Sequence, residues 1–325
     1  MSQFAPVSIT VYDRVDHLKK TIEALKLNPE SPDTVLYIFS DAARPGHEDK
    51  IEKVRAYIRG IDGFAEVRTH FQDRNSYFRN IEEAREIPLR EFGRLIRMED
   101  DIVVSPHFLT YMNDALDRYC DDARVFSISG YAPALPDQAS QAAFLSKDFS
   151  AWGYATWADR ELTSCLNRRD YYTAFQSNPA AKRAALRLHP TMLATVRLIE
   201  RGRANPNDYK ASAHQFLSGT YSLKPPKSLV RNIGFDGSGM AGSGARSTRF
   251  DTEYAVERPH LPDKLAYDET IDMILFNQYF PKSWRMRLNV WKLDILGRLP
   301  DRLYFLLRKT KGKLNGRLSA SQQRN

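Results

Sequence analysis

The sequence predicts an α/β protein in which a mostly parallel sheet is flanked by helices. Short apolar segments of strand length alternate along the first half with segments whose apolar residues recur at helical spacing. Polar residues follow successive strands, as they do where parallel strands end at one edge of a sheet. With 325 residues, 42% of them hydrophobic, the chain can bury a large core.

Five strands are expected in the first half, and the third is the most polar of them. They are Val7–Val11, Val35–Phe39, Val67–Phe71, Arg94–Met98 and Val125–Ser129. Apolar residues at helical spacing place helices after the first strand, after the second and after Ser105-Pro106, and the stretch Asp73–Arg85 is expected to become helical. This alternation favours βαβ units.

The second half is less regular. We expect an aromatic segment over Ser150–Trp157 and a helix over Trp157–Leu166. A long helical stretch over Arg168–Arg203 follows and is interrupted at Asn205–Tyr209. Two short extended pieces are expected within Phe216–Val230. Asn232–Thr248 is rich in Gly and Ser and is expected to be mobile. The expected division is a domain over residues 1–258 and a helical, basic extension over 259–325 with a disordered end.

Charge is concentrated at the C-terminus. The net charge is +8, yet residues 298–325 hold eight Lys or Arg and one acid, so the rest of the chain is nearly neutral. This distribution argues against a nucleic-acid-binding face on the body. The two cysteines, Cys120 and Cys165, have no metal-ligand spacing, and we expect reduced thiols in a cytoplasmic protein that has no signal peptide.

The segment RLIRMEDDIVV, residues 94–104, carries the clearest chemical signal. Glu99, Asp100 and Asp101 directly follow an apolar strand, at the end where open α/β sheets bind ligands. Neighbouring carboxylates repel one another unless a cation joins them. Oxygen ligands suit Mg²⁺ or Mn²⁺, which bind one or two carboxylates together with substrate phosphates. An acidic strand-to-helix turn without chemistry is the alternative.

The other strand ends add polar residues to the same predicted edge of the sheet. They are Asp13 and Arg14, Ser40 and Asp41, and Arg74 and Asn75. Neither GxGxxG nor GxxxxGK[ST] occurs at these turns, which excludes the usual dinucleotide-binding and P-loop motifs. The alternative is that loops are polar in general.

Several segments together resemble bacterial GT-A glycosyltransferases of the sugar-transferase type. The segments are TVYDR, YIFSD, RN at 74–75, MEDDIVVSPHFLTYMNDAL, SISGY, WGYATW and SLVRNIGFDGSG. These enzymes are distantly similar to the eukaryotic enzyme that adds N-acetylglucosamine to mannose. The resemblance covers about Val7 to Gly244 and implies a GT-A, Rossmann-like fold that binds a nucleotide-sugar donor, for which we expect a UDP-sugar.

The resemblance also implies roles for individual residues. Asp101, the last acid of EDD, would bind the divalent metal, while Asp41 would meet the base and Arg14 the base or diphosphate. The remaining donor-binding positions are Thr10, Tyr12, Ser40, Arg74, Asn75, Glu99, Asp100, Trp152, Gly153 and Tyr154. Plain core packing is the alternative for Trp152 and Trp157.

Glycosyl transfer needs a base for the acceptor hydroxyl, and a carboxylate within hydrogen-bond reach supplies one. Asp208 matches the position of the base in the related eukaryotic enzyme, and Glu161 is the reserve candidate. The family usually has Trp beside this acid, where this chain has Tyr209. The alternative for Asp208 is a loop acid in an Asx turn. Relatives also tend to have His after DGSG, where this chain has Met240, and Arg246 could replace it.

The resulting prediction is an inverting, metal-dependent glycosyltransferase that acts on a hydroxyl of a glycan or lipid-linked acceptor. A catalytically inactive relative that binds nucleotide-sugar or glycan, or that assists assembly, is the second function class. A Mg²⁺-dependent phosphohydrolase is a distant third. The basic C-terminal segment, with Trp291, Leu293, Ile295, Leu296 and Leu299, further predicts peripheral contact with the inner face of the cytoplasmic membrane. Packing on the body or on a second subunit is the alternative.

Overall fold

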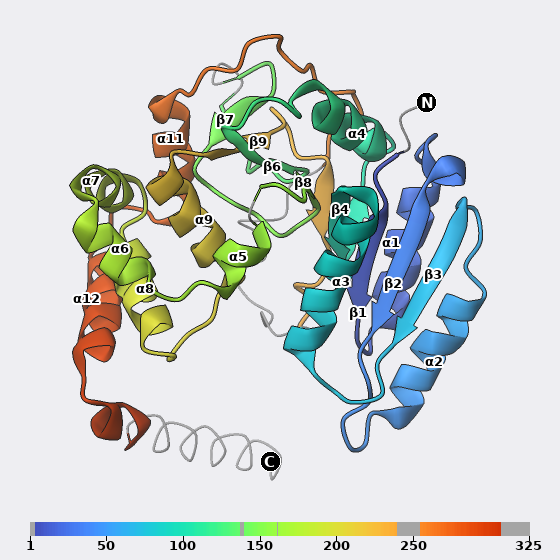
Figure 1. The fold of residues 1–325 in the computed structure, drawn as a ribbon, viewed down its shortest axis with the longest axis horizontal. Helices are drawn as coiled ribbons and strands as arrows, with labels where there is room; N and C mark the ends of the chain where they lie inside the picture. The colour runs from blue at the N-terminus through green and yellow to red at the C-terminus, as the bar shows by residue number, and fades with distance from the viewer. Residues whose placement is uncertain (1–3, 137–139, 161, 239–253, 307–325) are drawn as a thin grey trace.

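The computed structural model describes residues 4–136, 140–160, 162–238 and 254–306. Its centre is an eight-stranded mixed sheet in the order β3-β2-β1-β4-β8-β6-β9-β7, and helices flank it. In Figure 1 the strands β1–β3 lie at one side of the molecule and the helices α6–α9, α11 and α12 lie at the other. The α/β class predicted from the sequence is confirmed.

The first half follows the predicted alternation closely. Its strands run parallel in the order β3-β2-β1-β4. Its elements are β1 (Val7–Val11), α1 (Val15–Lys26), a 3-10 turn (Ser31–Asp33), β2 (Val35–Ser40), α2 (Glu48–Arg59), β3 (Glu66–Phe71), α3 (Tyr77–Phe92) and β4 (Arg94–Glu99). Helix α3 continues past the predicted Arg85 and through Pro88, and it ends at Gly93, whose φ of 71° suits a residue without a side chain.

The sheet then changes direction at a strand that the sequence did not reveal. β8 (Tyr154–Trp157) is antiparallel to β4 and to β6 (Val125–Ser129), between which it lies. The predicted helix Trp157–Leu166 is therefore wrong at its start, and α5 covers only Leu162–Asn167. Because all four residues of β8 are buried, the strand lacks the polar alternation that identifies a half-exposed strand.

The remaining strands complete the far edge of the sheet and build a second, small one. β9 (Tyr221–Lys224) runs parallel to β6, and β7 (Phe144–Ser146) is antiparallel to β9. β5 (Ile102–Val104) and β10 (Val230–Asn232) form a separate antiparallel pair. The chain after the acidic turn therefore enters β5 first, and α4 (Phe108–Arg118), the helix expected after Ser105-Pro106, begins after His107.

The long predicted helix Arg168–Arg203 is three helices. They are α6 (Tyr171–Ser177), α7 (Pro179–Leu188) and α8 (Met192–Glu200). Asn178 caps α7 by accepting a hydrogen bond from the Ala181 backbone N–H, and Pro179 follows at the first helical position. The predicted interruption Asn205–Tyr209 is the start of α9 (Asn207–Ser218).

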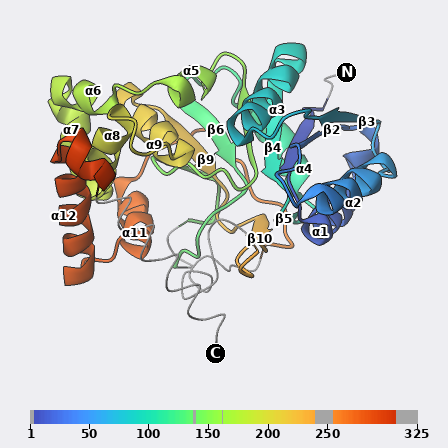
Figure 2. The ribbon, with the colours of Figure 1, turned by 90° about the horizontal axis from the view of Figure 1, so that it is seen from below.

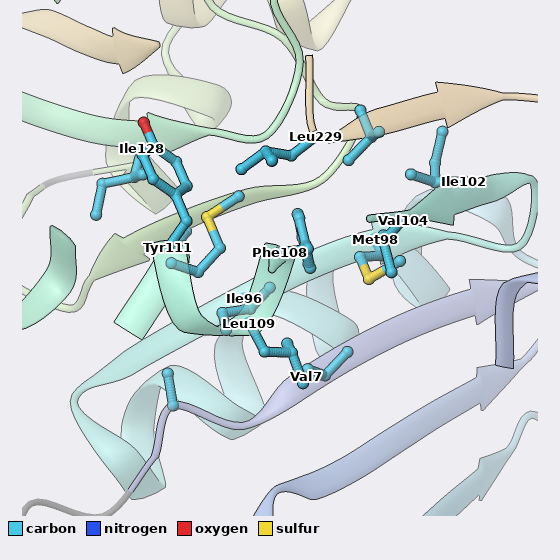
Figure 3. Packing of buried hydrophobic residues seen from close by; sticks show 14 of the residues in the cluster. Val7, Ile96, Met98, Ile102, Val104, Phe108, Leu109, Tyr111, Ile128 and Leu229 are labelled. Atoms are coloured by element: carbon cyan, nitrogen blue, oxygen red, sulfur yellow. The ribbon is translucent and has the colours of Figure 1, made fainter. Parts of the chain in front are cut away.

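The main core lies where the first sheet strands meet α4 and the small sheet. Figure 3 shows Phe108, Leu109 and Tyr111 of α4 among side chains from β1, β4, β5 and β6. The Phe108 ring also packs against Gly130 and Gly153. An added Cβ would lie 2.7 Å from the ring at Gly130 and 3.2 Å from it at Gly153. A separate apolar cluster joins α6, α7, α8, α9 and Phe276 of α11 (Glu269–Tyr279).

The C-terminal segment packs on the body as far as it is described. Asp272 of α11 accepts hydrogen bonds from the Ser146 hydroxyl and the Lys147 backbone N–H, and Leu261 and Leu265 lie in the main core. α12 (Trp284–Arg298) lies against α8 at the edge of the molecule, as Figures 1 and 2 both show. Within the described ranges, no helix is long and apolar enough to cross a bilayer.

Candidate active site

The acidic turn lies where β4 leaves the sheet. Glu99 is the last residue of β4, and Asp100 and Asp101 form the turn into β5. Thr21 of α1 fixes this turn, since its hydroxyl donates to the Asp100 carbonyl at 2.8 Å. Burial raises the pKa of Asp100 to about 6, although the adjacent Arg14 guanidinium opposes this shift.

Arg14 pairs with both aspartates of the turn. It stands between β1 and α1, and one guanidinium nitrogen pairs with Asp100 Oδ1 and, at 2.8 Å, with Asp101 Oδ2. Asp101 Oδ1 is buried and has no hydrogen-bond partner among the described residues. A buried carboxylate oxygen without a partner beside a paired cation fits a site for a divalent ion. Because no three metal-ligating side chains cluster within the described ranges, substrate phosphates would have to complete the shell.

The backbone after β10 passes directly over Asp101. The Ile233 N–H donates to the Asp101 carbonyl at 2.9 Å, and a Cβ on Gly234 would lie 2.0 Å from Asp101 Oδ2. Only glycine therefore fits at this position without moving the carboxylate. The segment that follows reaches α1, where Asp236 Oδ2 lies 3.1 Å from His17 Nε2. The sequence reasoning missed His17, because a single His on a helix carries no motif.

Asp208 comes from a distant segment, the start of α9, and lies near enough to the acidic turn for its charge to act on Glu99. It lies in the first turn of α9, where acidic residues are favoured by the helix dipole, and not in the expected loop. The side chain is exposed, yet the protein atoms crowded around its carboxylate raise its pKa to about 7. The negative charge of Asp148 adds to this rise, and Lys224 opposes it.

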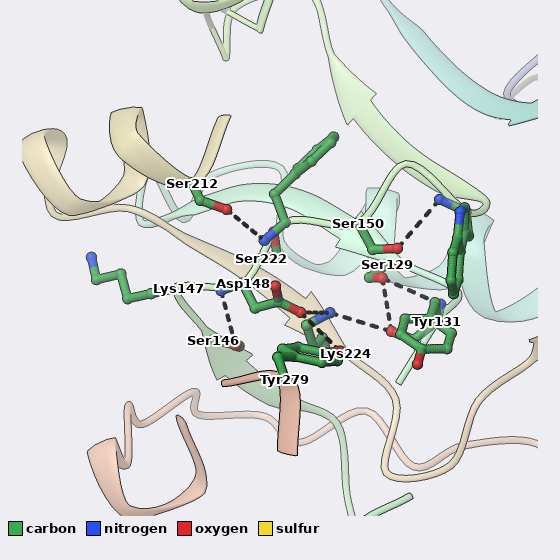
Figure 4. A network of polar contacts seen from close by, with 12 residues as sticks. Ser129, Tyr131, Ser146, Lys147, Asp148, Ser150, Ser212, Ser222, Lys224 and Tyr279 are labelled. Atoms are coloured by element: carbon green, nitrogen blue, oxygen red, sulfur yellow. Dashed lines mark hydrogen bonds and ion pairs between the residues drawn. The ribbon is translucent and has the colours of Figure 1, made fainter. Parts of the chain in front are cut away.

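Asp148 and Lys224 form a second charged pair that the sequence did not reveal. Lys224 at the end of β9 is completely buried, and its Nζ lies 3.0 Å from Asp148 Oδ2. Tyr279 of α11 donates to the same carboxylate at 3.3 Å, and Lys224 also donates to the Tyr131 carbonyl at 3.4 Å. Figure 4 shows these residues converging from separate segments. Their only sequence signal is two polar residues at the edges of apolar stretches.

Glu99 lies between the acidic turn and Asp208 in its electrostatic effects. It is half buried, and its pKa rises to about 8, first because of burial and then because of the charges of Asp101 and Asp208. Burial also raises the pKa of Tyr77 at the start of α3, with contributions from Glu99 and Asp208. The structure therefore brings the predicted metal ligand and the predicted base into one electrostatic neighbourhood.

The predicted base-binding residues hold a loop together at the ends of β2 and β3. Asp41 Oδ1 accepts from the backbone N–H groups of Ala42 and Ser76 at 2.8 and 2.9 Å, and Oδ2 accepts from Asn75 Nδ2 at 3.0 Å. Arg74 is exposed beside them. Asp41 thus positions its own loop, and its contact with a nucleobase stays a prediction.

The neighbouring strand end supplies the other predicted donor-binding residues. Tyr12 accepts from the Arg44 N–H at 3.1 Å, and Thr10 accepts from Arg97 at 2.7 Å. Ser40 is fully buried at the end of β2. These residues lie on the same edge as Arg14, as the sequence predicts for carboxyl ends of parallel strands.

The aromatic segment before β8 faces the loop that covers Asp101. The Trp152 ring meets Tyr131 and Phe235 edge to face, with centroid distances of 4.8 and 5.7 Å. Gly153 has a φ of 67°, which its lack of a side chain permits, and Tyr154 is buried in β8. Three residues named from the sequence lie outside the described residues: Glu161, the predicted reserve base, Met240, and Arg246, the possible replacement for histidine.

Comparisons with known proteins give weak likenesses only. No family model matches the chain, and no curated protein matches it. Crystal structures of S. aureus TarS are similar to it. Residues 1–349 of TarS give a TM-score of 0.38 at 9% identity, covering 69% of this chain and 59% of that chain. The complex of the same residues with UDP-GlcNAc gives 0.40 at 10% identity, covering 91% and 82%. The longer TarS structure gives 0.33 at 10% identity, covering 71% and 37%.

The chain thus spans 59% of the first of these structures and 37% of the longer one. Such identities and TM-scores define neither a family nor an activity.

Proposed function

We propose that this protein is a metal-dependent, inverting glycosyltransferase that moves a sugar from a UDP-sugar to a hydroxyl of a glycan or lipid-linked acceptor. The observation that supports this is the convergence of two acidic groups from distant segments. Glu99, Asp100 and Asp101 end β4, and Asp208 begins α9, close enough for its charge to raise the pKa of Glu99.

The donor would bind at the edge that carries the acidic turn. Asp101, with its buried unpartnered Oδ1, would hold Mn²⁺ or Mg²⁺ together with the donor's phosphates. A bound divalent ion neutralises negative charge on a departing diphosphate. Arg14 can donate hydrogen bonds to phosphate oxygens once a cation occupies the carboxylates. Glu99 stands beside the two aspartates of the turn at the end of β4, where its carboxyl group would face the donor sugar.

The transfer itself needs a base, and Asp208 is suited to the role. The acceptor oxygen attacks the anomeric carbon of the donor sugar, and its proton passes to the Asp208 carboxylate. The bond between that carbon and the diphosphate breaks, and the nucleoside diphosphate leaves with the bonding electron pair. A base with a pKa of about 7 is ionised enough at neutral pH to accept a proton and basic enough to keep it during the step.

A binding protein without transferase activity is the second candidate. The pairing of Arg14 with both aspartates favours it, because an arginine that stayed there would exclude a metal ion. Thermal unfolding with a panel of nucleotide-sugars and Mn²⁺, followed by Mn²⁺-dependent donor hydrolysis, separates the candidates. We expect stabilisation by a UDP-sugar and slow release of UDP. Stabilisation without release supports the binding protein, and no stabilisation by any donor contradicts both.

A further inference from the structure

Helix α12 has two apolar faces, of which one packs on the body. Toward α8, an added Cβ on Gly297 would lie 3.0 Å from the Arg197 side chain, and Arg197 pairs with Asp294 of α12. Leu293 and Leu296, which the sequence suggested as membrane contacts, are only partly exposed. The inner face of α12 is thus already occupied by the body of the protein.

The outer face of α12 exposes four large apolar side chains. Trp284 is 69% exposed, Leu288 38%, Trp291 60% and Ile295 36%. They are spaced by four, three and four residues, so they lie in one narrow stripe along the helix. We call these four residues the outer stripe. The helix lies at the edge of the molecule in both ribbon views (Figures 1 and 2).

Basic residues border the outer stripe on both sides. On a helical projection Arg285 and Lys292 fall on one side, and Arg287 and Arg298 fall on the other. Asp294 is the one acidic residue of α12, and it is paired with Arg197 and, at 2.8 Å, with Arg298. The face therefore combines apolar side chains, two of them Trp, with an excess of positive charge at its borders, where four basic residues meet one acid.

We propose that the outer stripe of α12 lies on an anionic lipid surface. An interfacial helix of this kind buries its apolar side chains at the headgroup boundary, while its Lys and Arg side chains meet anionic headgroups. Tryptophan is particularly suited to this boundary, because its ring is apolar and its indole N–H can still bind water or a headgroup. This inference rests on the exposed residues of α12 and is independent of the proposed transferase activity.

A second copy of the chain fits this face less well. If two α12 helices paired through their stripes, Arg285, Arg287 and Lys292 would take the positions that border a coiled-coil seam. These residues would meet like charges, and Asp294, the only acid at such a position, is already held by Arg197. Like charges across a seam are destabilising, whereas an anionic surface is complementary to them.

The helix is also held firmly enough to act as a fixed platform. Arg203, whose side chain is completely buried, donates to the Leu299 carbonyl at 2.6 Å and also contacts the Leu296 carbonyl and Asp301. Helical residues 301–306 continue from this point and expose Leu303, Phe305 and Leu306 at 43%, 53% and 59%. The sequence then adds Arg308, Lys309, Lys311 and Lys313. Exposed apolar side chains therefore continue beyond the stripe as far as residue 306.

Vesicle binding of the full-length protein tests the proposal. We expect sedimentation with vesicles of phosphatidylglycerol and phosphatidylcholine at low salt, release as salt rises, and little binding to phosphatidylcholine alone. Replacing Trp284 and Trp291 with Ser should lower the partition coefficient at least about tenfold. Replacing Arg285 and Lys292 with Gln should lower it about fivefold per charge. Leu27→Ser, which changes a 67% exposed apolar residue elsewhere, is the matched control and should bind as the parent does.

Fluorescence gives a second, local readout. The chain has four Trp residues, and Trp157 is buried while Trp152 is partly buried, so a blue shift on vesicle addition reports mainly on Trp284 and Trp291. Unfolding curves verify that the Ser and Gln variants are folded. Absence of anionic vesicle binding by the parent overturns the proposal, as does unchanged binding by the folded Trp284→Ser/Trp291→Ser variant. A dimer that dissociates in this variant, without lipid binding, assigns the face to a second copy instead.

Discussion

Two groups of residues in the molecule pair carboxylates with a single cation, Arg14 at the acidic turn and Lys224 at Asp148, and the two cations differ in how firmly they are placed. Arg14 pairs with Asp100 and Asp101, stands between β1 and α1, and keeps 19% of its side chain exposed. Lys224 pairs with Asp148, ends a strand of the central sheet, and has no exposed side-chain surface.

This difference suggests different tasks for the two groups. An arginine at a strand-to-helix junction can leave its carboxylates when another cation arrives, so the first group is suited to exchange its cation. A buried lysine cannot separate from its carboxylate without leaving an unpaired charge in the protein interior. The second group is therefore suited to set the constant field in which Asp208 titrates.

The largest expected effect comes from removing Asp101, the predicted metal ligand of the acidic turn. Asp101→Ala should abolish Mn²⁺-dependent binding of the donor, because the buried carboxylate that would hold the ion is lost. The fold should remain intact, since the remaining contacts of the turn run through Thr21 and Asp100. Calorimetric titration with UDP-sugar, with and without Mn²⁺, measures this. Unchanged affinity and metal dependence in the variant would assign the metal elsewhere.

Asp208→Asn should affect turnover and not donor binding. A general base contributes about 10²–10⁴-fold, so turnover should fall within that range. In the parent, activity should rise with pH through about 7, because Asp208 must be ionised to accept the proton. Initial rates between pH 5.5 and 9 measure both effects. Near-normal turnover in the variant would move the role to Glu161 or another group.

Stability provides the control for that variant. The pKa of Asp208 in the folded state is raised from 3.8 to about 7, so the unfolded chain loses its proton first as pH rises. The parent therefore loses stability between about pH 4 and 7, and Asn at this position does not. We expect Asp208→Asn to be at least as stable as the parent at pH 8. A marked loss of stability there would attribute the lower turnover to misfolding.

The two groups also differ in how far the sequence predicted them. Asp100 and Asp101 follow an apolar strand directly, so a local pattern places them at the edge of the sheet. The pair of Asp148 and Lys224 depends on β7 and β8, which the sequence pattern did not resolve, as well as on β9, which is one of the two extended pieces expected within Phe216–Val230. β8 is buried on both faces and shows no alternation, and its partners β4 and β6 are far from it in the sequence.

Asp208 lies between these two cases. The sequence predicted its role from a resemblance, yet it placed the residue in a loop, because Pro206 and Asn207 are typical turn residues. In the structure Pro206 precedes α9 and the helix begins at Asn207. Its pKa could not be predicted, since crowding and the charges of Asp148 and Lys224 arise only from tertiary contacts. Arg14 was predicted at the donor, but its pairing with both aspartates required the structure.

Lys224→Met tests the fixed cation and should be costly in stability. Removing one partner of a buried ion pair costs about 3–5 kcal/mol, and the lower end applies because Asp148 keeps 15% of its side chain exposed. The pKa of Asp208 should rise further, so the activity should need a higher pH. Chemical denaturation and the pH profile measure the two effects. Lys227→Met, at an exposed lysine of the next turn, should change neither.

Asp148→Asn should have the smallest effect on the pH profile, in the opposite direction, although it should also lower stability because the buried Lys224 loses its anionic partner. The amide keeps an acceptor for Lys224 and Tyr279 but removes the negative charge that raises the pKa of Asp208. The acidic limb of the pH profile should therefore move to lower pH, whereas Lys224→Met moves it to higher pH. The shift should be modest, because crowding around Asp208 is the larger cause of its raised pKa. If both variants move the limb in the same direction, the field of this pair does not set the pKa of the base, and Asp148 and Lys224 serve only to hold β7, β9 and α11 together.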